Sequence, residues 1–102
     1  MTATVEVEVR NPSGLHARPA AVFVRAAGAH KADVRIKNLT TDSLEVNAKS
    51  IIALLSIGVL RGHRIRLTVS GDDEATAAEA LRSLVAAGIG EPVVASAPDR
   101  GV

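Results

Sequence analysis

One short stretch of the sequence, GLHARPAA from Gly14 to Ala21, brings together residues suited to phosphoryl chemistry. A neutral imidazole has a free lone pair near neutral pH and can bond covalently to phosphorus, so His16 is a candidate phosphoryl acceptor. Arg18 adds a permanently charged donor suited to phosphate oxygens. The unpaired N–H groups and positive dipole of a helix N-terminus stabilise anions, so we place a phosphate cradle at Ala17 and Arg18. From position alone, the alternative interpretation is that His16 is an ordinary helix cap or surface residue.

Hydrophobic periodicity predicts the elements that position this stretch. Alternating apolar and polar residues, typical of half-buried strands, occur in TVEVEVR (residues 4–10), ADVRIK (32–37), SLEVNA (43–48) and RIRLTVS (64–70). Apolar stripes and end signals predict three helices: residues 17–27, a short helix between Ser50 as N-cap and Gly58, and a helix from the acidic residues 72–74 to Gly88. The apolar stripes of the helices and the apolar faces of the strands are both buried when all helices cover one side of an antiparallel sheet. The predicted fold is an α+β open-faced sandwich with the order β-α-β-β-α-β-α.

The composition of the 102 residues limits the classes of function. With Phe23 as the only aromatic residue and a formal net charge of +1, the chain lacks the stacking platforms and basic excess that nucleic-acid binding uses. The absence of cysteine excludes disulfides and thiolate zinc sites and agrees with a reducing compartment. No signal peptide is visible, and no apolar run approaches the ~20 residues that span a bilayer. We therefore expect a cytoplasmic monomer without cofactor or membrane insertion, with one domain at residues 1–91 and a disordered tail at residues 92–102.

The other two histidines, His30 and His63, each lie in a predicted turn beside basic residues. No carboxylate or third histidine stands at metal-ligand spacing from either of them. We expect both to be surface residues and predict no metal site.

Three segments together resemble the HPr family, the histidine-containing phosphocarriers of the bacterial phosphoenolpyruvate:sugar phosphotransferase system (PTS). They are GLHARPAAVFVRAA, NAKSIIALLSIGV and GDDEATAAEALRSLVAAGIGE, and the resemblance runs from Val5 to Glu91. It implies the same sandwich fold, phosphorylation of His16 on Nδ1, assistance by Arg18, and a regulatory phosphorylation site at Ser50. It also implies a carrier rather than a turnover enzyme. The implied partners are enzyme I, the A components of sugar permeases and, in hosts that have one, an HPr kinase/phosphorylase.

The predicted short helix after Ser50 is apolar on two neighbouring stripes, one through Ile51, Leu54 and Gly58 and the other through Ile52, Leu55 and Val59. A short helix on a sheet buries one stripe, so the helix is either fully enclosed or exposes an apolar patch. The HPr resemblance favours exposure, because these carriers dock their partners through the first and second helices. The docking residues expected on this basis are Ala17, Ala21, Arg25, Ile51, Ile52 and Leu55.

Several alternatives stay open on the sequence alone. A small metal-binding or nucleic-acid-binding β-α-β-β-α-β module lacks support in the composition, and the arginine loop of an acylphosphatase is not found. A regulatory or nitrogen-branch paralogue of the carrier is closer, although the presence of His16 argues against a paralogue that has lost phosphotransfer. The connection from Asn38 to Ser43 is longer than the usual hairpin turn of the family. Ser13 either orients the imidazole or serves an ordinary turn.

Overall fold

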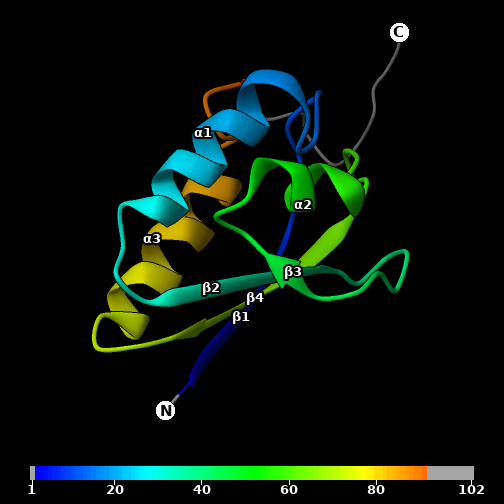
Figure 1. Ribbon diagram of the computed structural model, residues 1–102. Coiled ribbons are helices and arrows are strands. Elements are labelled where there is room, and N and C mark those ends of the chain that lie inside the picture. The colour runs from blue at the N-terminus through cyan, green and yellow to red at the C-terminus, as the bar shows by residue number, and fades with distance from the viewer. Residues whose placement is uncertain (1, 92–102) are drawn as a thin grey trace, which may run out of the picture.

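The computed structural model describes residues 2–91, and its elements follow the predicted order β-α-β-β-α-β-α (Figure 1). The elements are β1 (Thr2–Glu8), α1 (Ala17–Gly28), β2 (Asp33–Asn38), β3 (Val46–Asn47), α2 (Ile51–Ser56), β4 (Arg64–Ser70) and α3 (Glu74–Ala86). The predicted tail at residues 92–102 lies outside the described residues. No helix within residues 2–91 is long and apolar enough to cross a membrane.

The four strands form one antiparallel sheet in the order β1-β4-β2-β3. β4 lies between β1 and β2, so that Leu67 pairs with Val5 on one side and with Ile36 on the other. The three helices cover one face of this sheet, as predicted, and leave the other face open (Figure 1). Because successive side chains of a strand point to opposite faces, the apolar positions of each strand turn toward the helices.

The third strand is much shorter than the predicted segment 43–48, since only Val46 and Asn47 pair with β2. The side chain of Asn38 explains the difference, because its Oδ1 accepts hydrogen bonds from the N–H groups of Thr40 and Thr41. Ser43 is also held in this turn, where its N–H donates to the carbonyl of Asn38. These bonds satisfy backbone groups of the turn at residues 39–42, and residues 43–45, where a strand was predicted, connect this turn to β3 without ladder pairing.

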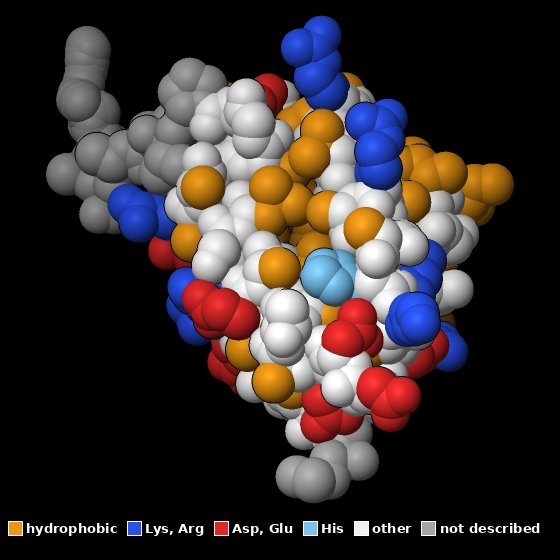
Figure 2. Space-filling view, turned by 90° about the vertical axis from the view of Figure 1, so that its left-hand side faces the viewer, with side chains coloured by type: hydrophobic (Ala, Val, Ile, Leu, Met, Phe, Trp, Pro, Cys, Tyr) orange, Lys and Arg blue, Asp and Glu red, His pale blue; other side chains and the backbone are white. Residues whose placement is uncertain are grey.

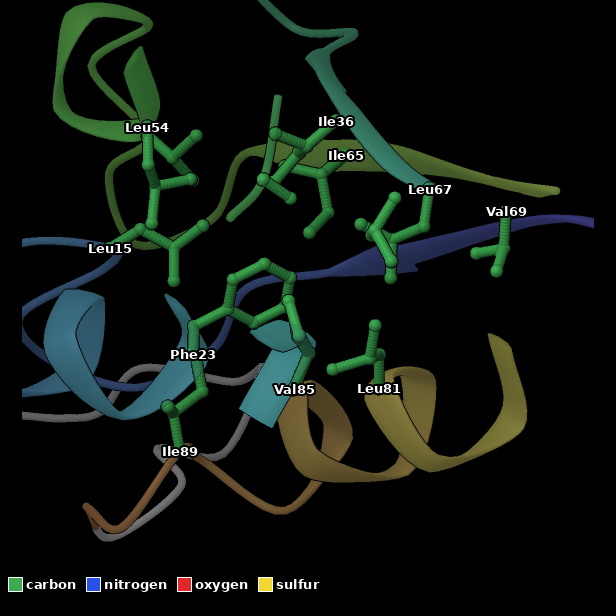
Figure 3. Close-up of a cluster of buried hydrophobic side chains, with 14 of the residues drawn as sticks. Leu15, Phe23, Ile36, Leu54, Ile65, Leu67, Val69, Leu81, Val85 and Ile89 are labelled. Atoms are coloured by element: carbon green, nitrogen blue, oxygen red, sulfur yellow. The ribbon is translucent and has the colours of Figure 1, made fainter. Parts of the chain in front are cut away.

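The core lies between the sheet and the helices, with Phe23 of α1 at its centre (Figure 3). The Phe23 ring lies between Ile65 and Leu67 of β4 and Val85 of α3, and all four side chains are fully buried. Burial of each such side chain contributes about 1.5–3 kcal/mol. This packing holds α1 against the sheet, and His16 directly precedes this helix.

Candidate functional site

His16 lies at the N-cap of α1 with extended backbone, φ −133° and ψ 162°. Its side chain makes no capping hydrogen bond, so the interpretation of His16 as an ordinary helix cap finds no support. Within the half-buried ring, Nε2 is enclosed and has no hydrogen-bond partner. Nδ1 is not among these enclosed atoms and makes no hydrogen bond within the described residues. Nδ1 is therefore the ring nitrogen that a reaction partner can reach.

The two residues after His16 supply the elements of an anion site. No hydrogen bond within residues 2–91 uses the backbone N–H of Ala17 or Arg18, and Pro19 has no N–H. Ala17 has a positive φ of 53°, a left-handed conformation that costs a non-glycine residue roughly 1–2 kcal/mol. The Arg18 side chain is exposed at the same helix end. Free N–H groups, the helix dipole and a guanidinium together favour a bound anion, which is the arrangement expected of a phosphate cradle.

The turn before His16 packs tightly against the loop that follows α2. Gly14 has a φ of 61°, and a Cβ atom at this position would lie 2.5 Å from the carbonyl oxygen of Val59 and 2.9 Å from Cα of Leu60. The N–H of Leu15 donates to the same Val59 oxygen at 3.0 Å. Only glycine fits this approach, so the turn and His16 have one fixed position relative to the loop.

Glu91, at the end of the described chain, binds the same turn. Its Oε1 accepts hydrogen bonds from Nδ2 of Asn11 at 2.9 Å and from the N–H of Ser13 at 3.0 Å. Its Oε2 accepts from the Ser13 hydroxyl at 2.8 Å, so Ser13 serves the turn and does not orient the imidazole. The bond from Asn11, the bonds from Ser13 and the charge of Arg18 lower the pKa of the Glu91 carboxyl below its ordinary value. The sequence interpretation missed Glu91, because its distance of 78 residues from Ser13 gives no local signal.

Ser50 is the N-cap of α2, as predicted, and its Oγ accepts a hydrogen bond from the N–H of Ala53 at 3.2 Å. The helix that follows is not enclosed, because Leu54 is fully buried whereas Ile52 is 79% and Leu55 41% exposed. The prediction of an exposed apolar surface is confirmed. Its extent was partly wrong: α2 ends at Ser56, so Val59 leaves the helical stripe and is buried in the core.

The expected docking residues are exposed on α1 and α2, two helices that contact each other. The apolar patch of α2 consists of exposed Ile51, Ile52 and Leu55, and α1 contacts α2. The residues of α1 that were expected to dock partners, Ala17, Ala21 and Arg25, are exposed as well. Figure 2 shows the side of the molecule formed by α1 and α3, where basic side chains lie at the upper edge and on both flanks and most acidic ones lie in the lower half. The apolar patch of α2 and the exposed residues of α1 therefore belong to two helices that contact each other.

The other two histidines, predicted to be surface residues, are partly exposed and also make structural contacts. His63 is partly buried, and its Nδ1 lies 3.0 Å from Nδ2 of Asn38 and accepts the N–H of Leu60 at 3.1 Å. His30 Nδ1 lies 3.5 Å from Oδ2 of Asp73, which joins the end of α1 to the start of α3. Residues 2–91 contain no cluster of three histidine or acidic side chains that could hold a metal ion.

Comparison with known proteins gives consistent matches. A family model described as the PTS HPr component phosphorylation site matches residues 3–87. The multiphosphoryl transfer protein of Haemophilus influenzae is 40% identical over 90 residues, which make up 88% of this chain but only 18% of that protein. The HPr-like protein Crh of Bacillus subtilis is 44% identical over 80 residues, 78% of this chain and 91% of Crh. The crystal structure of HPr from Thermoanaerobacter tengcongensis has a TM-score of 0.83 at 40% identity and covers 89% of this chain and 99% of that one.

An open-faced sandwich with an accessible histidine at the start of its first helix defines a class of small histidine-bearing carrier domains. The match of the family model over most of the chain makes the assignment specific. The chain belongs to the HPr family, the phosphocarriers of the phosphotransferase system. The resemblance and the fold inferred from the sequence are thus confirmed, and the acylphosphatase and metal-binding or nucleic-acid-binding alternatives are set aside.

Proposed function

We propose that the protein carries a phosphoryl group on Nδ1 of His16, which it accepts from phospho-enzyme I and passes to the A components of sugar permeases. The observation that carries the proposal is the reachable Nδ1 of the N-cap residue, followed by the N–H groups of Ala17 and Arg18, which make no hydrogen bond within residues 2–91. A phosphorus–nitrogen bond to His16 forms as the bond between phosphorus and the donor breaks. The same bond then breaks in transfer to the acceptor, so the carrier is regenerated and no other reactant is consumed.

The cradle residues act on the charge of the phosphoryl group. The N–H groups of Ala17 and Arg18 and the positive end of the α1 dipole stabilise the phosphate oxygens, and the Arg18 guanidinium adds charge-assisted hydrogen bonds. Loss of one such contact removes roughly 1.5–3 kcal/mol, so Arg18→Ala should fold normally and transfer phosphate about 10- to 150-fold more slowly. In this transfer the imidazole is the group that bonds to phosphorus, and the cradle residues do not.

Partners dock on the surface formed by α1 and α2. The apolar patch of Ile51, Ile52 and Leu55 supplies the buried contact, while Ala17 and Ala21 allow close approach to His16. Arg25 contributes electrostatic attraction toward acidic partners. The exposure of these side chains and the contact between α1 and α2 support this assignment.

Ser50 provides a point of regulation in hosts that have an HPr kinase/phosphorylase. Its hydroxyl caps α2 next to the apolar patch, so a phosphate there would carry about −1.5 to −2 charges at a helix N-terminus. The helix dipole favours that charge, whereas a docking partner must desolvate it. Phosphorylation of Ser50 therefore leaves the fold intact and weakens docking.

The decisive test is incubation with enzyme I and phosphoenolpyruvate, followed by mass spectrometry for an acid-labile phosphate. Wild type should gain one phosphate and His16→Ala none. His30→Ala is the matched control and should be labelled like wild type. Labelling of His16→Ala would overturn the assignment. Absence of labelling in folded wild type would favour the alternative that the chain is a regulatory member of the family. The similarity to the HPr-like protein Crh is the reason to test this alternative.

A further inference from the structure

Three hydrogen bonds converge on the carboxylate of Glu91 from the turn that precedes the candidate phosphoacceptor. The donors are Nδ2 of Asn11, the N–H of Ser13 and the hydroxyl of Ser13, all within 3.0 Å of a Glu91 oxygen. Asn11 is fully buried, and Glu91 and Ser13 are half-buried. We call this set the Glu91 clamp. Charge-assisted hydrogen bonds of this kind are roughly twice as strong as neutral ones, so the clamp is a strong restraint on the turn.

A series of residues restrained by hydrogen bonds and packing connects the Glu91 clamp to His16. Nδ2 of Asn11 also donates to the carbonyl of Gly14 at 2.9 Å, and the N–H of Gly14 donates to the carbonyl of Asn11. Gly14 is wedged against the backbone of Val59 and Leu60, and the fully buried Leu15 is the only residue between Gly14 and His16. A shift of the turn at Ser13 is therefore passed on to the imidazole, because no flexible residue lies between them.

The clamp also places a negative charge near the cradle. Besides the hydrogen bonds from Asn11 and Ser13, the charge of Arg18 contributes to the lowered pKa of Glu91, so the carboxylate is ionised at neutral pH. An incoming phosphoryl group and Glu91 thus both attract the Arg18 guanidinium. The distance of 80 residues between Glu91 and Asn11 shows that the clamp joins the last described residue of the domain to its first loop.

From this geometry we infer that Glu91 is a positioning residue for phosphotransfer, which holds the Asn11–Gly14 turn so that Nδ1 of His16 meets the phosphoryl donor in line. The inference rests on the proposed function. Glu91 does not touch the reacting atoms and acts through Asn11 and Ser13. Because a misplacement of about 1 Å by a change outside the reacting groups can cost up to ~10²-fold in rate, loss of the clamp should lower the transfer rate substantially.

The test compares Glu91→Ala, Glu91→Gln and the matched control Glu79→Ala in the full chain. Glu79 is an exposed glutamate on α3 whose carboxylate binds Arg82 instead of the turn. Steady-state transfer from phospho-enzyme I gives kcat and KM, and NMR gives the chemical shifts of the His16 ring and the Ser13 amide. We expect Glu91→Ala to lower kcat about tenfold with little change in KM and to shift the His16 ring signals. Glu91→Gln keeps an oxygen acceptor and should recover part of the rate, and Glu79→Ala should match wild type.

One further measurement and one further variant distinguish a folding defect from a loss of positioning. Circular dichroism establishes that each variant is folded at the assay temperature, and Ser13→Ala, which removes a single hydrogen bond, replaces Glu91→Ala if that variant unfolds. Unchanged kcat and His16 ring shifts in a folded clamp variant would overturn the inference. Failure of wild type to accept phosphate would instead refute the proposed function, and the ring shifts would still report whether Glu91 positions His16.

Discussion

Replacement of Ile52 by glutamate separates docking from folding, because 79% of this side chain is exposed at the surface of α2. Surface substitutions away from special features change stability by no more than about 0.5 kcal/mol, so Ile52→Glu should unfold at nearly the same temperature as wild type. The neighbouring Leu54 is fully buried, and the same change there should prevent folding. Whether a glutamate on α2 leaves the protein folded therefore depends on the burial of the replaced side chain and not on its hydrophobicity alone.

The effect on docking follows from the exposed area. Full burial of an isoleucine side chain is worth about 1.5–3 kcal/mol, so burial of the exposed 79% of Ile52 by a partner is worth up to about 1.2–2.4 kcal/mol. Loss of this contact corresponds to an increase in KM of roughly 7- to 60-fold, and the desolvation of a carboxylate adds to it. Because His16 and its cradle are unchanged, kcat should stay near the wild-type value.

The assay is phosphate transfer from enzyme I over a range of carrier concentrations, with Leu44→Glu as the matched control. Leu44 is 83% exposed in the turn between β2 and β3, outside the apolar patch of α2, so the control introduces the same charge at a similar exposure. Leu44→Glu should leave KM unchanged. An equal KM for wild type and folded Ile52→Glu would refute the patch as a docking surface, and an equal rise in both variants would point to a general effect of charge.

Four further predictions address the site. Gly14→Ala should lose about 2–5 kcal/mol, measured by urea unfolding, because it combines a left-handed backbone with a clash against Val59 and Leu60. Ala17→Gly should be neutral to about 1 kcal/mol more stable, since relief of the positive φ offsets the entropy of glycine, and a clear loss of stability would contradict strain at Ala17. Ser50→Asp should stay folded and accept phosphate with a raised KM, whereas an unchanged KM would leave Ser50 as a cap only. Because folding lowers the pKa of Glu91, the clamp stabilises the protein above the ordinary value of 4.5 and loses this effect as pH falls through the folded pKa, so the stability difference between wild type and Glu91→Gln should shrink in acid.

The fold could be predicted largely because its signals are local. The alternation around Val34 and Ile36 and the helical spacing of Ala20, Phe23 and Ala27 each identify a buried face within a few residues, and these side chains are buried. The length of β3 could not be predicted in this way, because it depends on how the Asn38 side chain folds back on the next turn. Side-chain capping of a turn competes with strand pairing and leaves no periodic pattern.

The sequence predicts the candidate residues His16 and Arg18 but not the residues that contact the turn before them. His16 and Arg18 are neighbours in sequence at a helix start, so their proximity needs no knowledge of the fold. The contacts that position them come from Val59 and from Glu91, the latter 78 and 80 residues from its partners Ser13 and Asn11. Such contacts depend on how the sheet and α3 bring distant segments together, and a single sequence does not carry that information.

Phosphoryl transfer at His16 and partner docking at the apolar patch depend on different parts of the fold, so regulation can act on one without the other. His16 is positioned by the Asn11–Gly14 turn, the loop after α2 and Glu91, whereas the apolar patch depends on α2 and its cap at Ser50. A charge at Ser50 therefore acts on the surface that partners must desolvate and leaves the restraints on the imidazole in place. Modification of Ser50 should change the affinity for partners rather than the intrinsic reactivity of His16. A change in the Glu91 clamp should have the opposite effect, with altered reactivity and unchanged affinity.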